Sequence, residues 1–500
     1  MKRLSLARFG LLLAALWVLA ACERDTEPKR AASDPSKLDV VVFGSEMEGM
    51  YLARAAKDEG LSVIVIDPRE KPGGQLIQGE MHYLDEAFEG SGKSLLQGRV
   101  KLLFDAYKKG DIRKKEEFVA YFNQLSDGIP IESGISITNV EIKEDPATNK
   151  RRVESVSYRT KDGTTKTVSA RYWVENTDFA ALTSKLGLQR IPGIETVFGG
   201  KKDYMASSLM MKFRNVDWAK FQQEVNKLGK KGIEETYGAE TTVTDTFTWG
   251  FGNVGGRFKP SSSDVFLRGL NTVNQRDGDV LINALLLYDV DPSSEESVRQ
   301  AIELGRRETE RVLPHLRQEL PGWEKAEING YPEYLYVRDY DRYETEYVLQ
   351  ATDLMSGTMY DDNVSIAGYA LDLQGTKNHV WGSRKGVPDK YGMPLRSFIP
   401  KGYSNVITAG KNVGASAVAY GSARIQPNTA LAGEVIGILL ARLDDKRVLS
   451  ELSAKEMKEL HSYVQKKHGI RLSGVTGADK IKHLTDEQRR QLNEGKLVIE

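Results

Sequence analysis

The sequence predicts an α/β protein built around a parallel sheet, and three stretches of the chain carry this prediction. Residues 38–43 form a short apolar run rich in β-branched residues, which leads through a glycine turn into a helical pattern and then into a second apolar run at 61–66. Residues 135–174 place apolar residues two apart, as short strands do, with one-residue slips that indicate bulges. Residues 405–440 have the pattern of a buried strand, a glycine loop and an apolar helix. Helices between strands are typical of parallel sheets.

The composition is that of a folded globular protein and excludes several functional classes. The chain has 500 residues, 40% of them hydrophobic, which corresponds to about two to four domains. Its 70 basic and 70 acidic residues balance without a basic stripe or tail, so we expect no nucleic-acid partner. One cysteine cannot form an intramolecular disulfide, and the six histidines show no metal-ligand spacing. Any redox chemistry is therefore expected to come from an organic cofactor.

The N-terminus has the pattern of a bacterial export signal. A basic start is followed by residues 9–22, which carry no charge. This stretch is too short for a comfortable membrane anchor, because a spanning helix needs about 20 apolar residues to cross roughly 30 Å of hydrocarbon. It ends in Leu19-Ala20-Ala21-Cys22, which resembles a lipobox, a cleavage site whose cysteine is acylated and becomes the new N-terminus. An ordinary cleaved signal with a chance cysteine is the alternative.

The lipobox resemblance implies a lipoprotein. We expect a signal peptide at 1–21, lipid on Cys22, and a polar tether at 22–37 before the fold begins near Leu38. The chain would then be exported and lipid-anchored to the outer face of a bacterial membrane. The basic start lacks an Arg-Arg pair with the usual context, which favours export of the unfolded chain.

Residues 38–67 have the pattern of a βαβ unit that binds a dinucleotide. The turn Gly44-Ser45-Glu46-Met47-Glu48-Gly49 joins the first strand to the helix, and Asp67 ends the second strand. In such units the glycines let the backbone approach a pyrophosphate at the helix N-terminus, and the acid binds ribose hydroxyls. Glu46 stands where a second glycine would lie, and its carboxylate would repel phosphate unless it turns into solvent or onto a basic group. A purely structural βαβ unit is the alternative.

The residues after Asp67 indicate which dinucleotide is bound. The segment Pro68-Arg69-Glu70-Lys71-Pro72-Gly73-Gly74-Gln75 adds a second glycine turn, which resembles flavoproteins of the glutathione-reductase type and which NAD enzymes usually lack. A hairpin through the turn at 161–164 then leads into Val174-Glu175-Asn176-Thr177-Asp178-Phe179. Flavoproteins of this type usually have an Ala-Thr-Gly segment here, and Asp178 replaces its glycine.

The C-terminal region of the chain resembles the bacterial FAD-dependent oxidoreductase family. The resemblance rests on 391–401, on the strand and glycine loop of 405–414 and on 421–428 before an apolar helix, and it extends to 333–354. The matching positions are Pro394, Arg396, Pro400, Lys401, Asn405, Ala409, Gly410, Gly421, Ser422 and Arg424, with Val406 and Lys411 as mild departures. Together these motifs cover about residues 38 to 445.

This resemblance implies FAD as the cofactor and a discontinuous domain to hold it. The implied fold is a Rossmann-type FAD-binding domain, a parallel sheet with helices and a β-meander, plus an inserted α+β cap domain. The implied FAD-binding residues are Gly44, Ser45, Glu46, Gly49, Asp67, Pro68, Arg69, Gly73, Gly74, Gln75, Ala409, Gly410 and Asn412. The FAD-binding domain is expected in two segments, 38–188 and 390–446, with the substrate or cap domain at 189–389 between them and a helical C-terminal surface appendage at 447–500.

The cap is expected to combine strands with a long helix. Val280 to Leu287 form an apolar strand pattern, and a helix is predicted from a Ser293-x-x-Glu296 capping box through Arg311. Such an α+β unit would cover the flavin ring.

Four residues are candidates for catalysis: Arg424, Arg396, His379 and Tyr391. Flavin chemistry needs orientation, a proton carrier and a positive charge near the ring. Arg424 shortly precedes the predicted apolar helix that ends at residue 440, and it is expected near the flavin or a substrate carboxylate. His379 and Tyr391 are candidate proton donors. Each is open to a structural alternative, and Arg338 is expected to be a salt-bridge partner among neighbouring acids.

Two functions follow. The first is a membrane-anchored FAD-dependent oxidoreductase that transfers a hydride between a small organic substrate and flavin N5, with an unidentified electron acceptor. The alternative is a lipid-anchored binding protein on a flavoprotein scaffold with weak or lost FAD turnover, which Glu46 and Asp178 favour. A soluble NAD dehydrogenase fits the Gly73-Gly74 pair poorly.

Overall fold

The computed structural model describes residues 37–146, 148–443 and 447–499, so the expected signal peptide and Cys22 lie outside the described residues. At the centre is a seven-stranded sheet of order β3-β2-β1-β6-β5-β4, in which β19 also pairs with β6. Its strands are β1 (Leu38–Phe43), β2 (Val63–Asp67), β3 (Ile131–Ser133), β4 (Ser136–Asp145), β5 (Lys150–Arg159), β6 (Thr165–Glu175) and β19 (Val406–Thr408).

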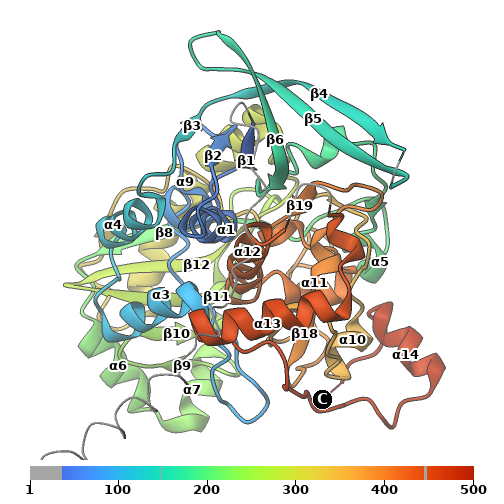
Figure 1. Cartoon of the computed structure of the whole chain (residues 1–500). Helices are drawn as coiled ribbons and strands as arrows, with labels where there is room; N and C mark the ends of the chain where they lie inside the picture. Colours follow the sequence, from blue (N-terminus) through green and yellow to red (C-terminus); the bar gives the residue numbers. More distant parts are fainter. Residues whose placement is uncertain (1–36, 147, 444–446, 500) are drawn as a thin grey trace, which may run out of the picture.

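Strand β6 joins a parallel sheet to an antiparallel meander. Its first half pairs antiparallel with β5, and its last residues pair parallel with β1 on one side and with β19 on the other. Figure 1 shows β4, β5 and β6 as a long ribbon that rises above the rest of the molecule. The expected slips in this meander are present as register shifts between Ile137 and Asn139 and between Glu141 and Ile142.

Both faces of the central sheet are buried, because alternate residues of a strand point to opposite sides. Val40 and Val42 of β1 point into the core on the helical side. Val41 and Phe43 point to the other side, where they join a smaller core beneath the meander. A continuous apolar run such as 38–43 is therefore what this position requires.

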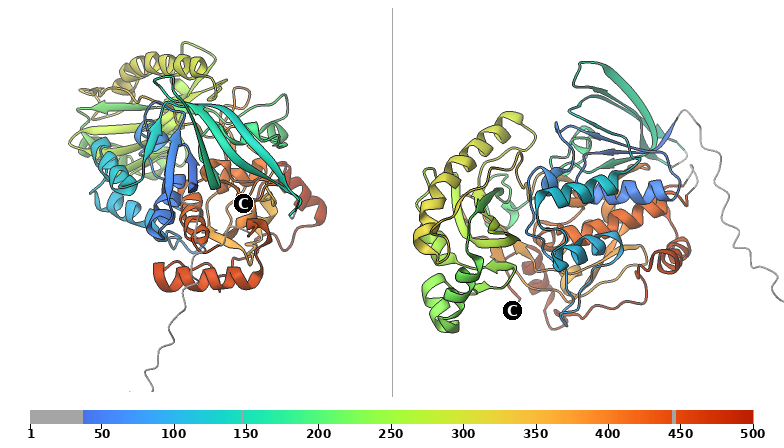
Figure 2. Two further views of the ribbon diagram at one scale, coloured as in Figure 1. Left: turned by 45° about the horizontal axis from the view of Figure 1, so that its top comes forward. Right: turned by 90° about the vertical axis from the view of Figure 1, so that its left-hand side faces the viewer.

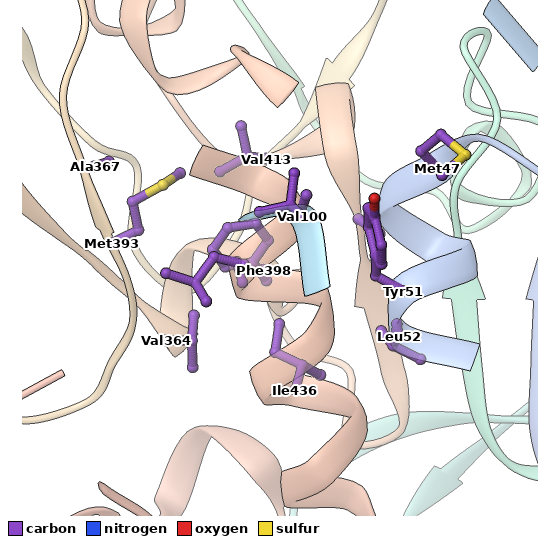
Figure 3. Packing of buried hydrophobic residues seen from close by; sticks show 14 of the residues in the cluster. Met47, Tyr51, Leu52, Val100, Val364, Ala367, Met393, Phe398, Val413 and Ile436 are labelled. Atoms are coloured by element: carbon purple, nitrogen blue, oxygen red, sulfur yellow. The ribbon is translucent and has the colours of Figure 1, made fainter. Parts of the chain in front are cut away.

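Helices α1 and α12 lie side by side on the helical face of the sheet (Figure 1). Figure 3 shows Tyr51 and Leu52 of α1 on one side of α12, and Val364 and Phe398 in the core on the other. Ile436 belongs to α12 itself. The helices of this region are α1 (Met47–Asp58), α2 (Gly74–Ile77), α3 (Gly98–Lys109), α4 (Lys115–Ser126), α11 (Ala417–Ala423) and α12 (Gln426–Leu440).

A second sheet, of order β13-β8-β12-β11-β10-β9, forms a separate layer with its own core between residues 209 and 337. Helix α9 lies across the face of this sheet that points away from the central sheet (Figure 2). The elements of this layer are β8 (Ser207–Arg214), α6 (Trp218–Asn226), α7 (Gly229–Tyr237), β9 (Thr242–Val243), β10 (Phe247–Trp249), α8 (Gly252–Arg257), β11 (Val265–Arg276), β12 (Asp279–Leu287), α9 (Glu295–Glu319) and β13 (Glu327–Ile328).

The start of α9 differs from the sequence prediction by one residue. Ser294, and not Ser293, is the N-cap, and its side chain accepts a hydrogen bond from the backbone N–H of Ser297. The Ser293 hydroxyl instead donates to Asp291 at 2.6 Å. The predicted Ser293 cap is therefore wrong, because a nearby carboxylate in the preceding turn competes for that hydroxyl. The helix also continues beyond Arg311 to Glu319.

Short elements connect the two layers and complete the main core. They are α5 (Glu195–Phe198), α10 (Ala351–Met355), the pair β7 (Arg190–Ile191) and β14 (Arg342–Tyr343), the pair β15 (Asn363–Ala367) and β18 (Tyr391–Pro394), and the pair β16 (Asp372–Leu373) and β17 (Ser383–Arg384). Beyond residue 446 the chain forms α13 (Ala454–His468) and α14 (Asp486–Asn493). Met457, Leu460 and Leu492 of these helices are buried in the main core, so this segment is packed into the fold.

The predicted fold class is confirmed: a mixed α/β fold of the Rossmann type, with a parallel sheet, helices and a β-meander, plus an additional α+β layer. Within the described ranges, no helix combines the length and apolarity that crossing a membrane requires. The same residues contain no group of three or more His, Cys, Asp or Glu side chains placed to hold a metal ion.

Candidate functional site

Three segments meet at the carboxyl ends of β1, β2 and β19, and we call them the dinucleotide site: residues 44–49, 67–75 and 409–412. Ligands of doubly wound α/β folds bind at this edge of the sheet. The C-terminal segment reaches it because β19 pairs with β6, and Ala409 N then donates to Glu175 O at 2.8 Å. The structure therefore brings together the FAD-binding residues predicted from the two ends of the chain.

Asn176 explains why the first turn needs both of its glycines. A Cβ at Gly44, whose φ is +89°, would lie 2.7 Å from the Asn176 carbonyl oxygen, and one at Gly49 would lie 2.1 Å from Asn176 Nδ2. That amide donates to the backbone oxygen of Glu46 at 2.7 Å. The glycines are thus required by contacts within the protein, whatever they contribute to a ligand. Sequence reasoning missed Asn176, which carries no signal beyond its place at the end of β6.

Asp67 ties the two glycine turns together. One carboxylate oxygen accepts hydrogen bonds from the backbone N–H of Ser45 at 3.0 Å and from the Ser45 hydroxyl, while the other accepts from Arg69 N at 2.8 Å. The Ser45 hydroxyl also accepts from Gly73 N at 2.7 Å. Burial raises the pKa of Asp67 to about 6 against the lowering effect of these hydrogen bonds. The acid predicted to bind ribose is therefore engaged by protein donors.

The Glu46 carboxylate points into the site. Both of its oxygens accept from Gln75 N at 3.1 Å, and a Cβ at Gly74 would lie 2.3 Å from the Glu46 carboxyl carbon. Only 6% of Glu46 is exposed, and burial raises its pKa to about 8 although Lys411 lowers it. The carboxylate therefore turns onto the backbone of the second glycine turn and does not reach solvent.

Lys411 and Glu48 complete the charges around the Gly410 turn. Lys411 Nζ donates to Gln75 Oε1 at 2.8 Å and to the Val337 carbonyl at 2.7 Å. Both carboxylate oxygens of Glu48 are buried without a hydrogen-bond partner among the described residues, and burial raises its pKa. Gly410, with φ +58°, lies against the Glu48 side chain. Two buried carboxyl groups thus face one lysine.

Arg69 contacts two aromatic rings beside Asp67, the acid predicted to bind ribose. Its guanidinium is 4.2 Å from the centroid of the Phe179 ring and 4.3 Å from that of Tyr334. Arg69 also donates to Asp178 at 3.1 Å and to the Pro292 carbonyl at 2.8 Å, and the Tyr334 hydroxyl donates to Asp178 at 2.8 Å. Sequence reasoning does not assign Phe179 and Tyr334 to this site, because each lies far from Arg69 along the chain.

The family model described as FAD dependent oxidoreductase matches residues 39–461. The chain belongs to the FAD-dependent oxidoreductase family. Membership makes it a flavoenzyme with FAD as its cofactor, which confirms the two predictions made for enzyme class and cofactor. No curated protein matches the chain.

The oxidoreductase has distant likenesses among solved structures. A geranylgeranyl bacteriochlorophyll reductase-like protein from Thermoplasma acidophilum is 13% identical, with 93% of each chain covered and a TM-score of 0.38. The myxobacterial chondrochloren halogenase is 12% identical, with 87% of this chain and 80% of that chain covered and a TM-score of 0.37. A p-nitrophenol 4-monooxygenase from Pseudomonas putida is 12% identical, with 92% and 93% covered and a TM-score of 0.34.

The backbone of the dinucleotide site has the pattern for FAD, but the side chains do not leave room for it where they lie in this structure. Cavities of about 10 and 30 Å³ lie beside the site, whereas ligand pockets commonly have about 300–1,000 Å³. A cavity of about 900 Å³ lies elsewhere, between α14 and α10. FAD therefore does not fit into these cavities unless side chains of the site move.

Arg424 is the one catalytic candidate placed beside the dinucleotide site. It is 6% exposed, donates to the Tyr336 hydroxyl at 3.1 Å and lies 3.6 Å from Asp372. It lines the cavity of about 30 Å³ together with Gln75, Lys411 and Tyr336. A cation at this position can bind an anionic group of a substrate or stabilise negative charge that develops on a bound ring.

The other three candidates make their contacts elsewhere. Arg396 is paired with Asp362 at 2.9 Å on a half-exposed face. The Tyr391 hydroxyl is buried and lies 2.8 Å from the Ser422 hydroxyl. His379 is exposed, and its ring stacks on Phe198 with 4.6 Å between centroids. These contacts are structural in kind.

Arg338 does not pair with the neighbouring acids as expected. It donates to the Ala206 carbonyl, the Ser208 hydroxyl and Asn283 Oδ1, each at 2.8 Å. Asp339 instead pairs with Arg342. Residues adjacent in a non-helical segment point in different directions, so sequence neighbours need not be partners. Burial lowers the pKa of Arg338 to about 9.

Proposed function

We propose that this FAD-dependent oxidoreductase is exported, held on the outer face of a bacterial membrane by lipid on Cys22, and transfers a hydride between a small organic substrate and flavin N5. The lipobox pattern that ends at Cys22 supports the location. The Gly73-Gly74 turn, tied to Asp67 through Ser45, supports an FAD-binding domain of the glutathione-reductase type. The partners are the membrane, a small-molecule substrate and an electron acceptor.

One observation carries the proposal for the chemistry: Arg424 lies beside the predicted ribityl-binding Gln75. Both line the same cavity, and Lys411, which donates to Gln75, lines it as well. The carboxylate that lines this cavity is Asp85, whose pKa burial raises. The planar guanidinium of Arg424, which can bind a carboxylate with two N–H groups, favours a substrate with a carboxylate or another anionic group.

Two residues of this cavity, Arg424 and Tyr336, have separate tasks in the proposed reaction. FAD, when bound, supplies the carrier of the hydride. Arg424 binds and orients the anionic group of the substrate through its guanidinium. Tyr336 accepts a hydrogen bond from Arg424 at its hydroxyl oxygen, which leaves the hydroxyl proton free to be donated to the substrate.

Arg424→Lys tests this assignment, with Arg396→Lys as the matched control from another family motif. Because Lys cannot reproduce the planar fork, we expect Arg424→Lys to raise KM for an anionic substrate by about tenfold or more. Arg396 is paired at the surface with Asp362, so its variant should keep KM within about twofold. Substrates are found by bleaching of the visible flavin band. Equal effects of both variants would contradict the role of Arg424.

A second function is favoured by the side chains that fill the dinucleotide site. A lipid-anchored binding protein with weak or lost FAD turnover would have no need of an open site. In this site Glu46 accepts a hydrogen bond from Gln75 N, and Asp178 accepts one from Arg69. An absorption spectrum of the purified folded region from Leu38 onward separates the two. A flavin band that a substrate bleaches supports the enzyme, and a protein that stays colourless when FAD is added supports the binding protein.

A further inference from the structure

Two side chains of the protein occupy positions in the dinucleotide site where the sequence pattern predicts parts of a bound dinucleotide. In a βαβ unit the pyrophosphate lies at the first turn, the ribose at the acid, and the base beyond the ribose. The Glu46 carboxylate, an anion when ionised, lies between the first turn and the Gly73-Gly74 turn and accepts from Gln75 N at 3.1 Å with both oxygens. It thus occupies the region where the cofactor's own anionic group belongs.

Arg69 is the second of these side chains. Its planar guanidinium lies over the Phe179 ring at 4.2 Å and over the Tyr334 ring at 4.3 Å from their centroids, so it covers two aromatic faces that a flat base could contact. The backbone N–H of the same residue donates to Asp67 at 2.8 Å, so these contacts lie next to the acid that would bind ribose. Asp178 fixes both Arg69 and Tyr334 by hydrogen bonds.

Above about pH 8, where Glu46 is ionised, the charges at the site also oppose a diphosphate. The negative charges of Asp178 and Glu48 raise the pKa of Glu46, and the positive charge of Lys411 lowers it. A dinucleotide would bring further negative charge beside these carboxyl groups. Like charges a few ångströms apart in a buried site repel strongly unless one is neutralised or moves.

We infer that the cofactor-free dinucleotide site is self-occupied: Glu46 stands in for the pyrophosphate and Arg69 for the base, and FAD binds only by displacing both side chains. This inference rests on the proposed function, because it takes FAD as the ligand. It has a direct consequence for a chain exported unfolded, since a self-occupied site lets the protein fold and stay folded before it meets the cofactor. The cost is weak binding of FAD.

A titration with FAD tests the inference without reference to activity. Quenching of flavin fluorescence gives the Kd for the wild type, for Glu46→Gly, and for Glu240→Gly as the control. Glu240 is exposed in the second layer, outside the dinucleotide site, and its φ of +60° suits glycine. We expect Glu46→Gly to bind FAD at least about tenfold more tightly than the wild type, because the side chain that fills the pyrophosphate position is removed. Glu240→Gly should match the wild type.

Glu46→Gln provides a second variant should the glycine variant not fold. It keeps the shape of the side chain and cannot ionise, so above pH 8 its Kd should fall between those of the wild type and Glu46→Gly. Arg69→Ala should also bind FAD more tightly, because it uncovers the faces of the Phe179 and Tyr334 rings. Circular dichroism of each variant without FAD checks that it is folded.

Two results would overturn the inference, and they differ in what they say about the proposed function. Wild-type protein that is purified with stoichiometric FAD, and binds it as tightly as Glu46→Gly, would show that the site is not self-occupied, while the oxidoreductase proposal would stand. Failure of the wild type and of every folded variant to bind FAD would overturn the inference and the proposed flavin chemistry together.

Discussion

Gly433 of α12 faces Glu48 of α1 so closely that a Cβ at Gly433 would lie 2.4 Å from the Glu48 carbonyl oxygen. One turn further on, Gly437 approaches the Leu52 carbonyl oxygen in the same way, at 2.4 Å. The two helices are therefore in contact through their backbones. This contact holds the first turn of the dinucleotide site, at the start of α1, against the C-terminal segment of the chain.

Gly433→Ala should lower the free energy of unfolding by about 1–3 kcal/mol, because the new methyl group forces α12 away from α1. Gly256→Ala is the control, since Gly256 is also helical but a Cβ there would have no heavy atom within 4 Å. There alanine should be neutral or stabilise by up to about 1 kcal/mol. Urea unfolding measures both. A loss of stability at Gly256 as large as at Gly433 would contradict the close-contact explanation.

The pH dependence of stability should reveal the buried Glu46. Its pKa in the folded protein is about 8, above the ordinary 4.5. The folded state thus holds the proton more tightly than the unfolded state, so this stabilisation is present below about pH 4.5 and is lost as the pH rises through 8. Lys411, Glu48 and Asp178 are the charged groups that face it.

Glu46→Gln should flatten the fall of the free energy of unfolding between those two pH values, as measured by urea unfolding at several pH values. A smaller fall should remain, because the pKa of Asp67 and that of Glu48 are also raised by burial. Glu70→Gln, at an exposed position, should leave the wild-type profile unchanged. Parallel profiles for wild type and Glu46→Gln would contradict the buried, protonated state of this group.

Arg69→Lys should destabilise the cofactor-free protein by about 1–2 kcal/mol, because lysine keeps the charge but loses the planar group that lies over the Phe179 and Tyr334 rings. Arg306→Lys is the control: Arg306 is exposed and lies 5.5 Å from the single ring of Tyr331. Its variant should stay within about 0.5 kcal/mol of the wild type. Thermal unfolding without FAD distinguishes the two variants. Equal melting temperatures for both would contradict a stabilising contact of Arg69 with the two rings.

Leu492→Ala should lower the free energy of unfolding by about 2–5 kcal/mol, because the Leu492 side chain of α14 is fully buried in the main core. Leu228→Ala, at a position that is 45% exposed, should change it by less than about 1 kcal/mol. Chemical denaturation checks both values. A Leu492 variant as stable as the Leu228 variant would mean that the C-terminal helices contribute little to the core.

Much of the fold follows from local patterns in the sequence. The β-branched run of 38–43, the glycine turn and Asp67 predict the first βαβ unit, because strand and helix periodicities and turn glycines are properties of neighbouring residues. The one-residue slips in the apolar alternation of the meander can be predicted from the sequence for the same reason. The predicted N-cap of α9 is wrong by one residue, since Ser293 and Ser294 have the same chemistry and only the position of Asp291 separates them.

Local sequence patterns specify which residue types arrive at the dinucleotide site and that both ends of the chain supply them. The directions of their side chains depend on the tertiary structure. Glu46 turns onto Gln75 because Gly74 leaves room for it, and Arg69 stacks on Tyr334, which lies far along the chain in another layer of the fold. The direction of a buried side chain depends on partners that the fold brings from far away in the sequence, and no local pattern encodes them.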